Sequence, residues 1–168
     1  MENKILIAYA SRYGSTKEVA DEIGKVFSHA GAEVELAAMH MVKNFGRYTL
    51  VVLGTSIQMG KPLKEAVTFV RKYHDELRKT PVALFSVGLQ MKEDTEENRT
   101  KAKGFLTPLL DIIGKPVSVG LFGGRIDHKK FGLLLRFFAK REKTGMLGEG
   151  DWQNWEEIRK WAEFLIKQ

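Results

Sequence analysis

Three hydroxyl side chains lie close together just after the first apolar run of the chain. They belong to the stretch SRYGST, residues 11–16, where Ser11, Ser15 and Thr16 surround Gly14. Hydroxyls donate hydrogen bonds, and N–H groups at a helix start point outward at the positive end of the helix dipole. Together these groups would hold a phosphate with little need for a lysine. A helix N-cap formed by Ser15 or Thr16 explains the same residues, so both interpretations stay open for this stretch alone.

Several other chemistries lack the residues they need. The chain has no cysteine, which excludes disulfides, thiolate metal sites and cysteine nucleophiles. The Walker A pattern and the dinucleotide pattern G-x-G-x-x-G are both absent from the sequence. No aspartate ends the first or third apolar run, which argues against a phosphate-accepting receiver domain. We find no catalytic triad, no convincing carboxylate pair and no metal-ligand spacing among the histidines, which are His29, His40, His74 and His128.

Alternating strands and helices must position the hydroxyl-rich loop. Apolar runs predict strands, and apolar residues at helical spacing predict the helices between them. The strands are expected at 5–9, 33–37, 50–53, 82–87 and 117–122, and the helices at about 19–30, 63–73, 98–113 and 154–166. Pro62 is expected to open the second helix and Asn154 to cap the last. This alternation predicts an α/β fold, a three-layer α/β/α sandwich around a five-stranded parallel sheet.

Length and composition suit one domain with an ordinary core. The chain has 168 residues, of which 43% are apolar and 29% charged. A membrane-spanning helix needs about 18 consecutive apolar residues, and no such run occurs. Residues 1–4 lead straight into the first strand without a signal-peptide pattern, so we expect a cytoplasmic protein.

The segments that follow four of the strands share a common chemistry. They are ASRYGST after the first strand, GTSIQMGKP after the third, SVGLQ after the fourth and FGGRID after the fifth. All four have small or hydroxyl residues where the strand ends, after Phe122 in the last of them, and such residues let a flat ligand approach the backbone. Because ligands of open α/β sheets bind beyond the carboxyl ends of the strands, we expect these segments to form one site.

A long basic segment separates the fifth strand from the last helix. About thirty residues, 123–151, fill this gap, and a connection of that length is usually functional or partly structured. Residues 123–144 contain seven basic and two acidic residues, a net +5 of the chain's total +6. A helix from about Lys130 would carry an apolar stripe of Leu134, Phe137 and Phe138. Packing on its own domain, a membrane surface or quinone site, and docking of an acidic redox partner all remain open for 125–143. Nucleic acid is disfavoured because no recognised binding module accompanies the charge.

The motifs together resemble a known family. SRYGST is similar to the phosphate loop [ST]-x-x-G-x-[ST] of flavodoxin-like proteins, which cradles the phosphate of FMN. GTSIQMGKP, LFSVGLQ and the tail GDWQNWEEIRKWAEFL resemble the menaquinone-dependent, oxygen-independent protoporphyrinogen dehydrogenases, whose long insertion also precedes the last helix. The similarity covers essentially the whole chain. It implies the flavodoxin-like strand order 2-1-3-4-5 and one domain, 1–168, with an insertion at about 123–151.

The resemblance also implies which residues would bind FMN. The phosphate would be held by Ser11, Arg12, Tyr13, Gly14, Ser15 and Thr16. One face of the isoalloxazine ring would rest on Thr55, Ser56, Ile57, Gln58, Met59 and Gly60. The pyrimidine edge would be lined by Ser86, Val87, Gly88 and Leu89, with Gly123, Gly124 and Arg125 approaching the same rim. The chain departs from many flavodoxins because its third-strand segment has no aromatic residue to stack on the ring, only Gln58 and Met59.

The resulting functional hypothesis is an FMN-dependent oxidoreductase. The resemblance suggests protoporphyrinogen as the electron donor and a quinone or a protein as the acceptor. Two alternatives stay open: a flavodoxin-type electron carrier without its own substrate, and an interaction domain that has lost its flavin. The insertion allows a cytoplasmic protein that also contacts a membrane surface. Nothing in the sequence marks a subunit interface.

Overall fold

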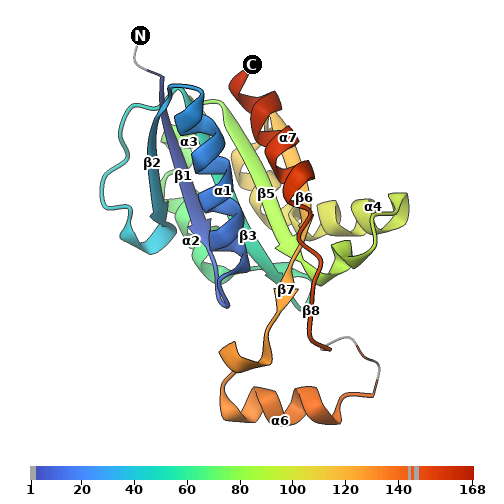
Figure 1. Cartoon of the computed structure of the whole chain (residues 1–168). Coiled ribbons are helices and arrows are strands. Elements are labelled where there is room, and N and C mark those ends of the chain that lie inside the picture. Colours follow the sequence, from blue (N-terminus) through green and yellow to red (C-terminus); the bar gives the residue numbers. More distant parts are fainter. Residues whose placement is uncertain (1–2, 144, 146–147) are drawn as a thin grey trace.

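The computed structural model is a parallel sheet between two layers of helices (Figure 1). It describes residues 3–143, 145 and 148–168. The sheet has the order β2-β1-β3-β5-β6, which confirms the predicted α/β sandwich and its predicted strand order. Its strands are β1 Lys4–Ala10, β2 Glu33–Ala38, β3 Leu50–Gln58, β5 Val82–Gly88 and β6 Ser118–Gly123.

Helices cover both faces of this sheet. One face carries α1 Ser15–His29 and α7 Trp155–Ile166, which lie in front in Figure 1. The other carries α2 Lys64–Lys72, α3 His74–Leu77, α4 Glu96–Phe105 and α5 Thr107–Ile113.

Alternation along β1 explains why the sheet is buried on both sides. Ile5 and Ile7 pack under α1 and α7, whereas Leu6 and Ala8 pack under the helices of the opposite face, and all four are at most 1% exposed. Continuous apolar runs are what a parallel strand with two covered faces requires. The central strand β1 is therefore covered on both faces by helices.

Three boundaries differ from the sequence prediction. β3 continues to Gln58, and Pro62 belongs to a short antiparallel strand, β4 Lys61–Pro62, instead of opening α2. The single helix expected over 98–113 is divided into α4 and α5. Pro108 lacks the N–H that would continue the hydrogen-bond ladder, and the Gly104 carbonyl instead accepts from the Thr107 hydroxyl at 2.8 Å. The predicted N-cap of α7 is confirmed, since Asn154 accepts from the N–H of Glu157 at 3.1 Å.

The segment predicted as an insertion extends beyond the carboxyl end of the sheet (Figure 1). Its two legs, β7 Arg125–Ile126 and β8 Gly150–Asp151, pair antiparallel. Between them lie a 3₁₀ turn at His128–Lys130 and the helix α6 Leu133–Arg141. This helix begins later than predicted, because Gly132 occupies the N-cap position.

Some sequence-based predictions fall on residues that the structure does not describe. Thr144, Met146 and Leu147 of the insertion lie outside the described residues. So do Met1 and Glu2, the start of the segment in which no signal-peptide pattern was found.

Gly54 tests the packing that holds β3 against β5. Phe85 is its register partner on β5, and a Cβ on Gly54 would overlap the buried Phe85 ring. We expect Gly54→Ala to lower the free energy of unfolding by about 3 kcal/mol, the upper end of the usual range for an overpacked core. Urea denaturation measures this free energy.

Gly104→Ala is the matched control, because nothing lies within 4 Å of its Cβ position on α4. That change should raise stability by about 0.5–1 kcal/mol. Equal effects at both positions would contradict the packing assignment.

Candidate functional site

The carboxyl ends of β1, β3, β5 and β6 lie together at one end of the sheet, which we call the rim. Parallel register places Ala10 beside Thr55, Thr55 beside Ser86, and Gly88 beside Gly123. The four segments that the sequence analysis selected therefore leave the sheet at neighbouring positions. What each side chain does there differs.

The loop at 11–16 leads into α1 through a glycine. Gly14 is the N-cap residue of α1, with φ 98° in the left-handed region, and it has no side chain to cap the helix. The N-cap interpretation of Ser15 or Thr16 is therefore wrong. Ser11 instead accepts a hydrogen bond at its Oγ from the Gly14 N–H at 3.1 Å, which orders the loop. The first N–H groups of a helix have no intrahelical acceptor, so this end of α1 is suited to an anion.

The hydroxyls of this loop have different partners. Thr16 is fully buried, and its Oγ1 lies 2.6 Å from the Oγ of Ser56, which ties the start of α1 to β3. The Ser15 hydroxyl has no hydrogen-bond partner within the part of the chain that the structure describes. Arg12, exposed at the loop surface, donates to the Gln58 side chain at 3.2 Å.

Thr55 and Ser86 lie below the rim, within the sheet. Both are at most 2% exposed. Thr55 donates through Oγ1 to the Ser56 carbonyl at 3.0 Å and accepts from the Leu63 N–H at 3.2 Å. Its hydroxyl therefore serves the β3–β4 connection.

A tight hairpin turn replaces the loop that was expected after the third strand. Met59 and Gly60 connect β3 to β4 with φ values of 50° and 70°. Two positive φ angles are typical of the type I′ turn, which normally selects asparagine or glycine. Met59 has this unfavourable backbone conformation and is 99% exposed, so a flexible thioether stands free at the rim. A non-glycine residue held in this region is often found at functional sites.

Glycines let the other strand exits approach each other. A Cβ on Gly88 would lie 3.1 Å from the Cβ of Ile57. A Cβ on Gly124 would lie 3.3 Å from Val87 and 3.7 Å from the Ser15 Oγ, so this glycine borders both the β5 exit and the start of α1. Gly123 has a different role, since a Cβ there would overlap the backbone carbonyl of Trp152.

An ionic network that the sequence analysis missed joins the insertion to the rim. Glu18, in the first turn of α1, accepts from Arg125 at 2.6 Å and from the Gln153 amide at 3.2 Å. Arg125 is thus paired with a carboxylate, although it was predicted to face the cofactor. The Oε1 of Gln153 is buried and has no hydrogen-bond donor among the described residues.

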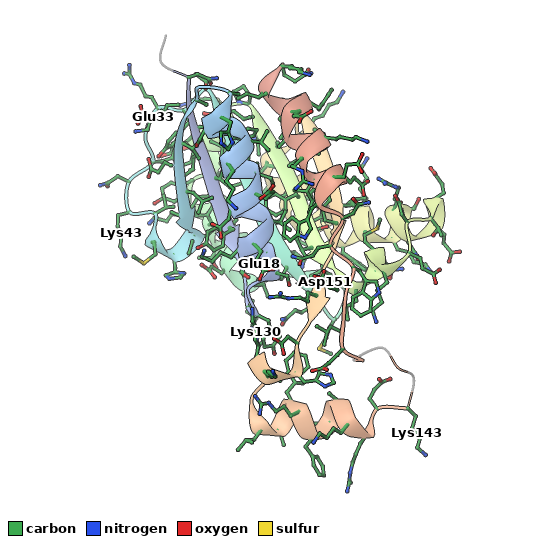
Figure 2. The ribbon with its side chains drawn as sticks, in the orientation of Figure 1. Glu18, Glu33, Lys43, Lys130, Lys143 and Asp151 are labelled. Carbon is green, nitrogen blue, oxygen red and sulfur yellow. The ribbon has the colours of Figure 1, made fainter. Side chains whose placement is uncertain are left out.

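Lys130 is a third residue whose place in the site the sequence analysis missed, after Glu18 and Gln153. Its Nζ lies 4.0 Å from Glu18 and only 3.1 Å from the position that a Cβ on Gly14 would take. Figure 2 shows Glu18 and Lys130 where the body of the molecule meets the insertion. An ammonium group therefore stands directly against the loop at 11–16. Because 116 positions separate Lys130 from Gly14, no local sequence signal could have paired them.

Aromatic packing holds the insertion in this position. The rings of Tyr13 and Phe131 are 5.1 Å apart between centroids. A small apolar cluster surrounds Phe131 and includes Ile126, Leu89 and Trp152. Tyr13 and Leu89, both predicted cofactor residues, thus also support the insertion.

Other charged groups near the rim are structural. Arg99 donates to Asp94 and to Glu157, the latter at 2.8 Å, and so links α4 to α7. The hydrogen bond from Arg99 lowers the pKa of the Asp94 carboxyl. Nδ1 of His128 lies 3.7 Å from a Glu149 oxygen. In the described ranges, no three acidic, histidine or cysteine side chains are placed to hold a metal ion.

Comparisons with known proteins place this fold in context. Over 95% of its length the chain is 25% identical to protoporphyrinogen IX dehydrogenase [quinone] from Escherichia coli K12, covering 92% of that protein. A mutant flavodoxin from Pseudomonas aeruginosa shares the fold with a TM-score of 0.57 at 17% identity, with 98% of this chain and 97% of that chain aligned. Rubredoxin oxygen:oxidoreductase from Desulfovibrio gigas aligns with a TM-score of 0.57 at 15% identity. That alignment covers 98% of this chain but only 35% of the longer protein.

A family model supplies the assignment itself. The flavodoxin domain model matches residues 6–145, which include the hydroxyl-rich loop, most of β1, the other four parallel strands and α6. The resemblance inferred from the motifs is thereby confirmed, and the chain belongs to the flavodoxin domain family.

Proposed function

We propose that this protein binds FMN at the rim and is an FMN-dependent oxidoreductase of the protoporphyrinogen dehydrogenase type. The observation that carries the proposal is the start of α1, where a glycine N-cap leaves the helix without a side-chain cap while Lys130 stands beside it. A helix start and an ammonium group together attract a phosphate. The chain is then one domain, 1–168, with the insertion at 123–151 placed over the cofactor.

The residues present fit the phosphate of FMN. Ser15 has a hydroxyl without a partner in the described part of the chain, and Ser11 holds the loop in shape through the Gly14 N–H. Arg12 lies at the loop surface, from which it would contribute positive charge. The buried Oε1 of Gln153 lacks a donor among the described residues, and a ribityl hydroxyl is a group that would supply one. In this proposal Tyr13, Gly14 and Thr16 shape the loop, and Lys130 supplies the ammonium.

The residues also fit a flat ring. Met59 would lie against one face, beside Ser56, Ile57, Gln58 and Gly60, and Thr55 would support them from within the sheet. Ser86, Val87, Gly88 and Leu89 would line the ring's edge, with Gly123, Gly124 and Arg125 beside them. FMN, when bound, supplies the electron-accepting chemistry. Backbone N–H groups of the β5 exit would tune it, because donors to the ring stabilise its reduced charge.

An enzyme and a carrier differ in whether the protein oxidises a substrate of its own. The Escherichia coli relative is named a quinone-dependent dehydrogenase, and the two chains align over nearly their full lengths. By analogy, two hydrogens would leave protoporphyrinogen at each oxidation step while a quinone takes up two electrons and two protons. A redox protein is the other acceptor class, and an electron carrier remains the alternative function. We propose a cytoplasmic location for this reaction.

Oxidation of protoporphyrinogen tests this function. The FMN-loaded protein is mixed anaerobically with protoporphyrinogen IX and a menaquinone analogue, and porphyrin fluorescence is followed. We expect fluorescence to rise only when both protein and quinone are present. Lack of fluorescence, with bound FMN still reduced by a ferredoxin-type donor, would assign the chain as a carrier. A protein that stays colourless after FMN is added would contradict both functions.

Lys130 provides a separate test of the phosphate site. Lys130→Ala should weaken FMN binding about fivefold to tenfold, a modest effect because the side chain is 41% exposed. Binding of riboflavin, which has no phosphate, should change less than about twofold. Fluorescence quenching measures both dissociation constants. Lys129→Ala removes a neighbouring exposed charge and should leave both unchanged. Equal weakening of FMN and riboflavin in Lys130→Ala would show that the ammonium does not contact the phosphate.

A further inference from the structure

One side of α6, formed by few residues, packs on the rest of the protein. Leu135 and Ala139 turn toward Ile126 and Phe131, and Ala139 is 8% exposed. Arg136 also turns inward, where its Nε donates to the His128 carbonyl at 2.7 Å. These contacts fix which side of the helix faces solvent.

Except for Leu135, the large apolar side chains of α6 face outward. They form an exposed apolar strip of four residues, with exposures of 86% for Leu133, 71% for Leu134, 50% for Phe137 and 56% for Phe138. The strip is continuous, because residues four apart in a helix lie one above the other. Most apolar side chains of this size are buried in a monomer, and a contiguous exposed group marks an interaction site. The predicted stripe therefore exists, but it faces away from the domain.

Positive charge surrounds this strip. Besides Lys130, whose ammonium lies against the loop at 11–16, four exposed basic side chains lie before, within or after α6, namely Lys129, Lys140, Arg141 and Lys143. The Arg141 guanidinium rests over the Phe137 ring at 4.3 Å, so cation and apolar surface are in contact. The combination of an apolar face and flanking cations is typical of helices that lie in a membrane interface.

The position of α6 favours a flat, anionic occupant. The helix is the outermost part of the insertion, beyond the carboxyl ends of the strands (Figure 1), and Figure 2 places Lys143 at its far end. A second copy of the chain would bring these four cations against their four counterparts, which disfavours self-association through this face. In the described ranges no helix has both the length and the apolar character that crossing a bilayer requires. Contact would therefore be with the membrane surface.

We propose that α6 docks on the surface of an anionic bilayer. The exposed apolar strip enters the boundary between headgroups and acyl chains, and the surrounding cations bind lipid phosphates. Since Phe131 packs on Tyr13, docking also turns the rim toward the membrane, within reach of a lipid-soluble quinone. Only this last consequence rests on the proposed function; docking itself does not require FMN.

Vesicle sedimentation tests the docking. The full chain is incubated with vesicles of phosphatidylcholine alone or with one third phosphatidylglycerol. We expect binding to the anionic vesicles only. Phe137→Ser/Phe138→Ser and Lys140→Gln/Arg141→Gln should each lower the partition coefficient by about tenfold or more.

Matched controls remove the same groups elsewhere. Val117→Ser/Phe164→Ser deletes two apolar side chains that are each 48% exposed, and Lys115→Gln/Lys167→Gln deletes two exposed charges. Both should bind like the original protein, and circular dichroism checks that all variants fold.

Equal loss in variants and controls would overturn the proposal. So would absence of binding to anionic vesicles, which would favour an acidic protein partner. A dimer that Phe137→Ser/Phe138→Ser dissociates would instead identify a second copy as the occupant. Because FMN is not needed, failure here leaves the FMN titrations unaffected.

Discussion

The first backbone N–H groups of α1 have no acceptor within the helix, and the rim lies directly beside them. A left-handed Gly14 starts the helix without offering a capping side chain. The hydroxyl of Thr16 is bonded to Ser56, so it is not available to cap the helix either. Parallel register then brings the exits of β3, β5 and β6 beside this helix start. The positive end of a helix dipole, left uncapped at the carboxyl end of a buried sheet, is suited to an anion.

The insertion is bonded to the start of α1, and in the proposed function it completes the cofactor site. Glu18 is the link, because one carboxylate in the first turn of α1 accepts from Arg125 on β7 and from Gln153, which follows β8. The same carboxylate lies 4.0 Å from Lys130, whose ammonium reaches Gly14. The partly buried carboxylate of Glu18 thus holds the cationic groups of Arg125 and Lys130 close to the start of α1. Without this carboxylate, neither cationic group would have this ion pair to orient it. The apolar contact of Phe131 with Tyr13 holds the same geometry, while α6 turns its largest side chains outward.

Much of the fold was predictable because its signals are local. Apolar runs identified the five parallel strands, and small or hydroxyl residues at their exits identified the rim. Pro62 was predicted to open a helix but belongs to β4, because proline is tolerated both at helix starts and in edge strands. The Met59–Gly60 turn before it was not recognised as a hairpin. Pro108 broke a helix that periodicity alone made continuous. Lys130, Glu18 and Gln153 could not be predicted, since their contacts join segments more than a hundred positions apart. The outward face of α6 depends on Leu135 and Ala139 being the side that packs, which the helical pattern does not indicate.

Hydrogen exchange with and without FMN tests the central claim most directly. If the cofactor binds at the rim and the insertion completes its site, FMN should slow exchange at 11–18, 56–60 and 86–89. The same slowing should appear at 124–131 and around Gln153, which the Glu18 network joins to the rim. Exchange in α2 and α3, on the opposite side of the sheet from α1, should not change. Protection confined to 11–18, with no change in 124–131, would contradict the role of the insertion, and no protection at the rim at all would contradict the site itself.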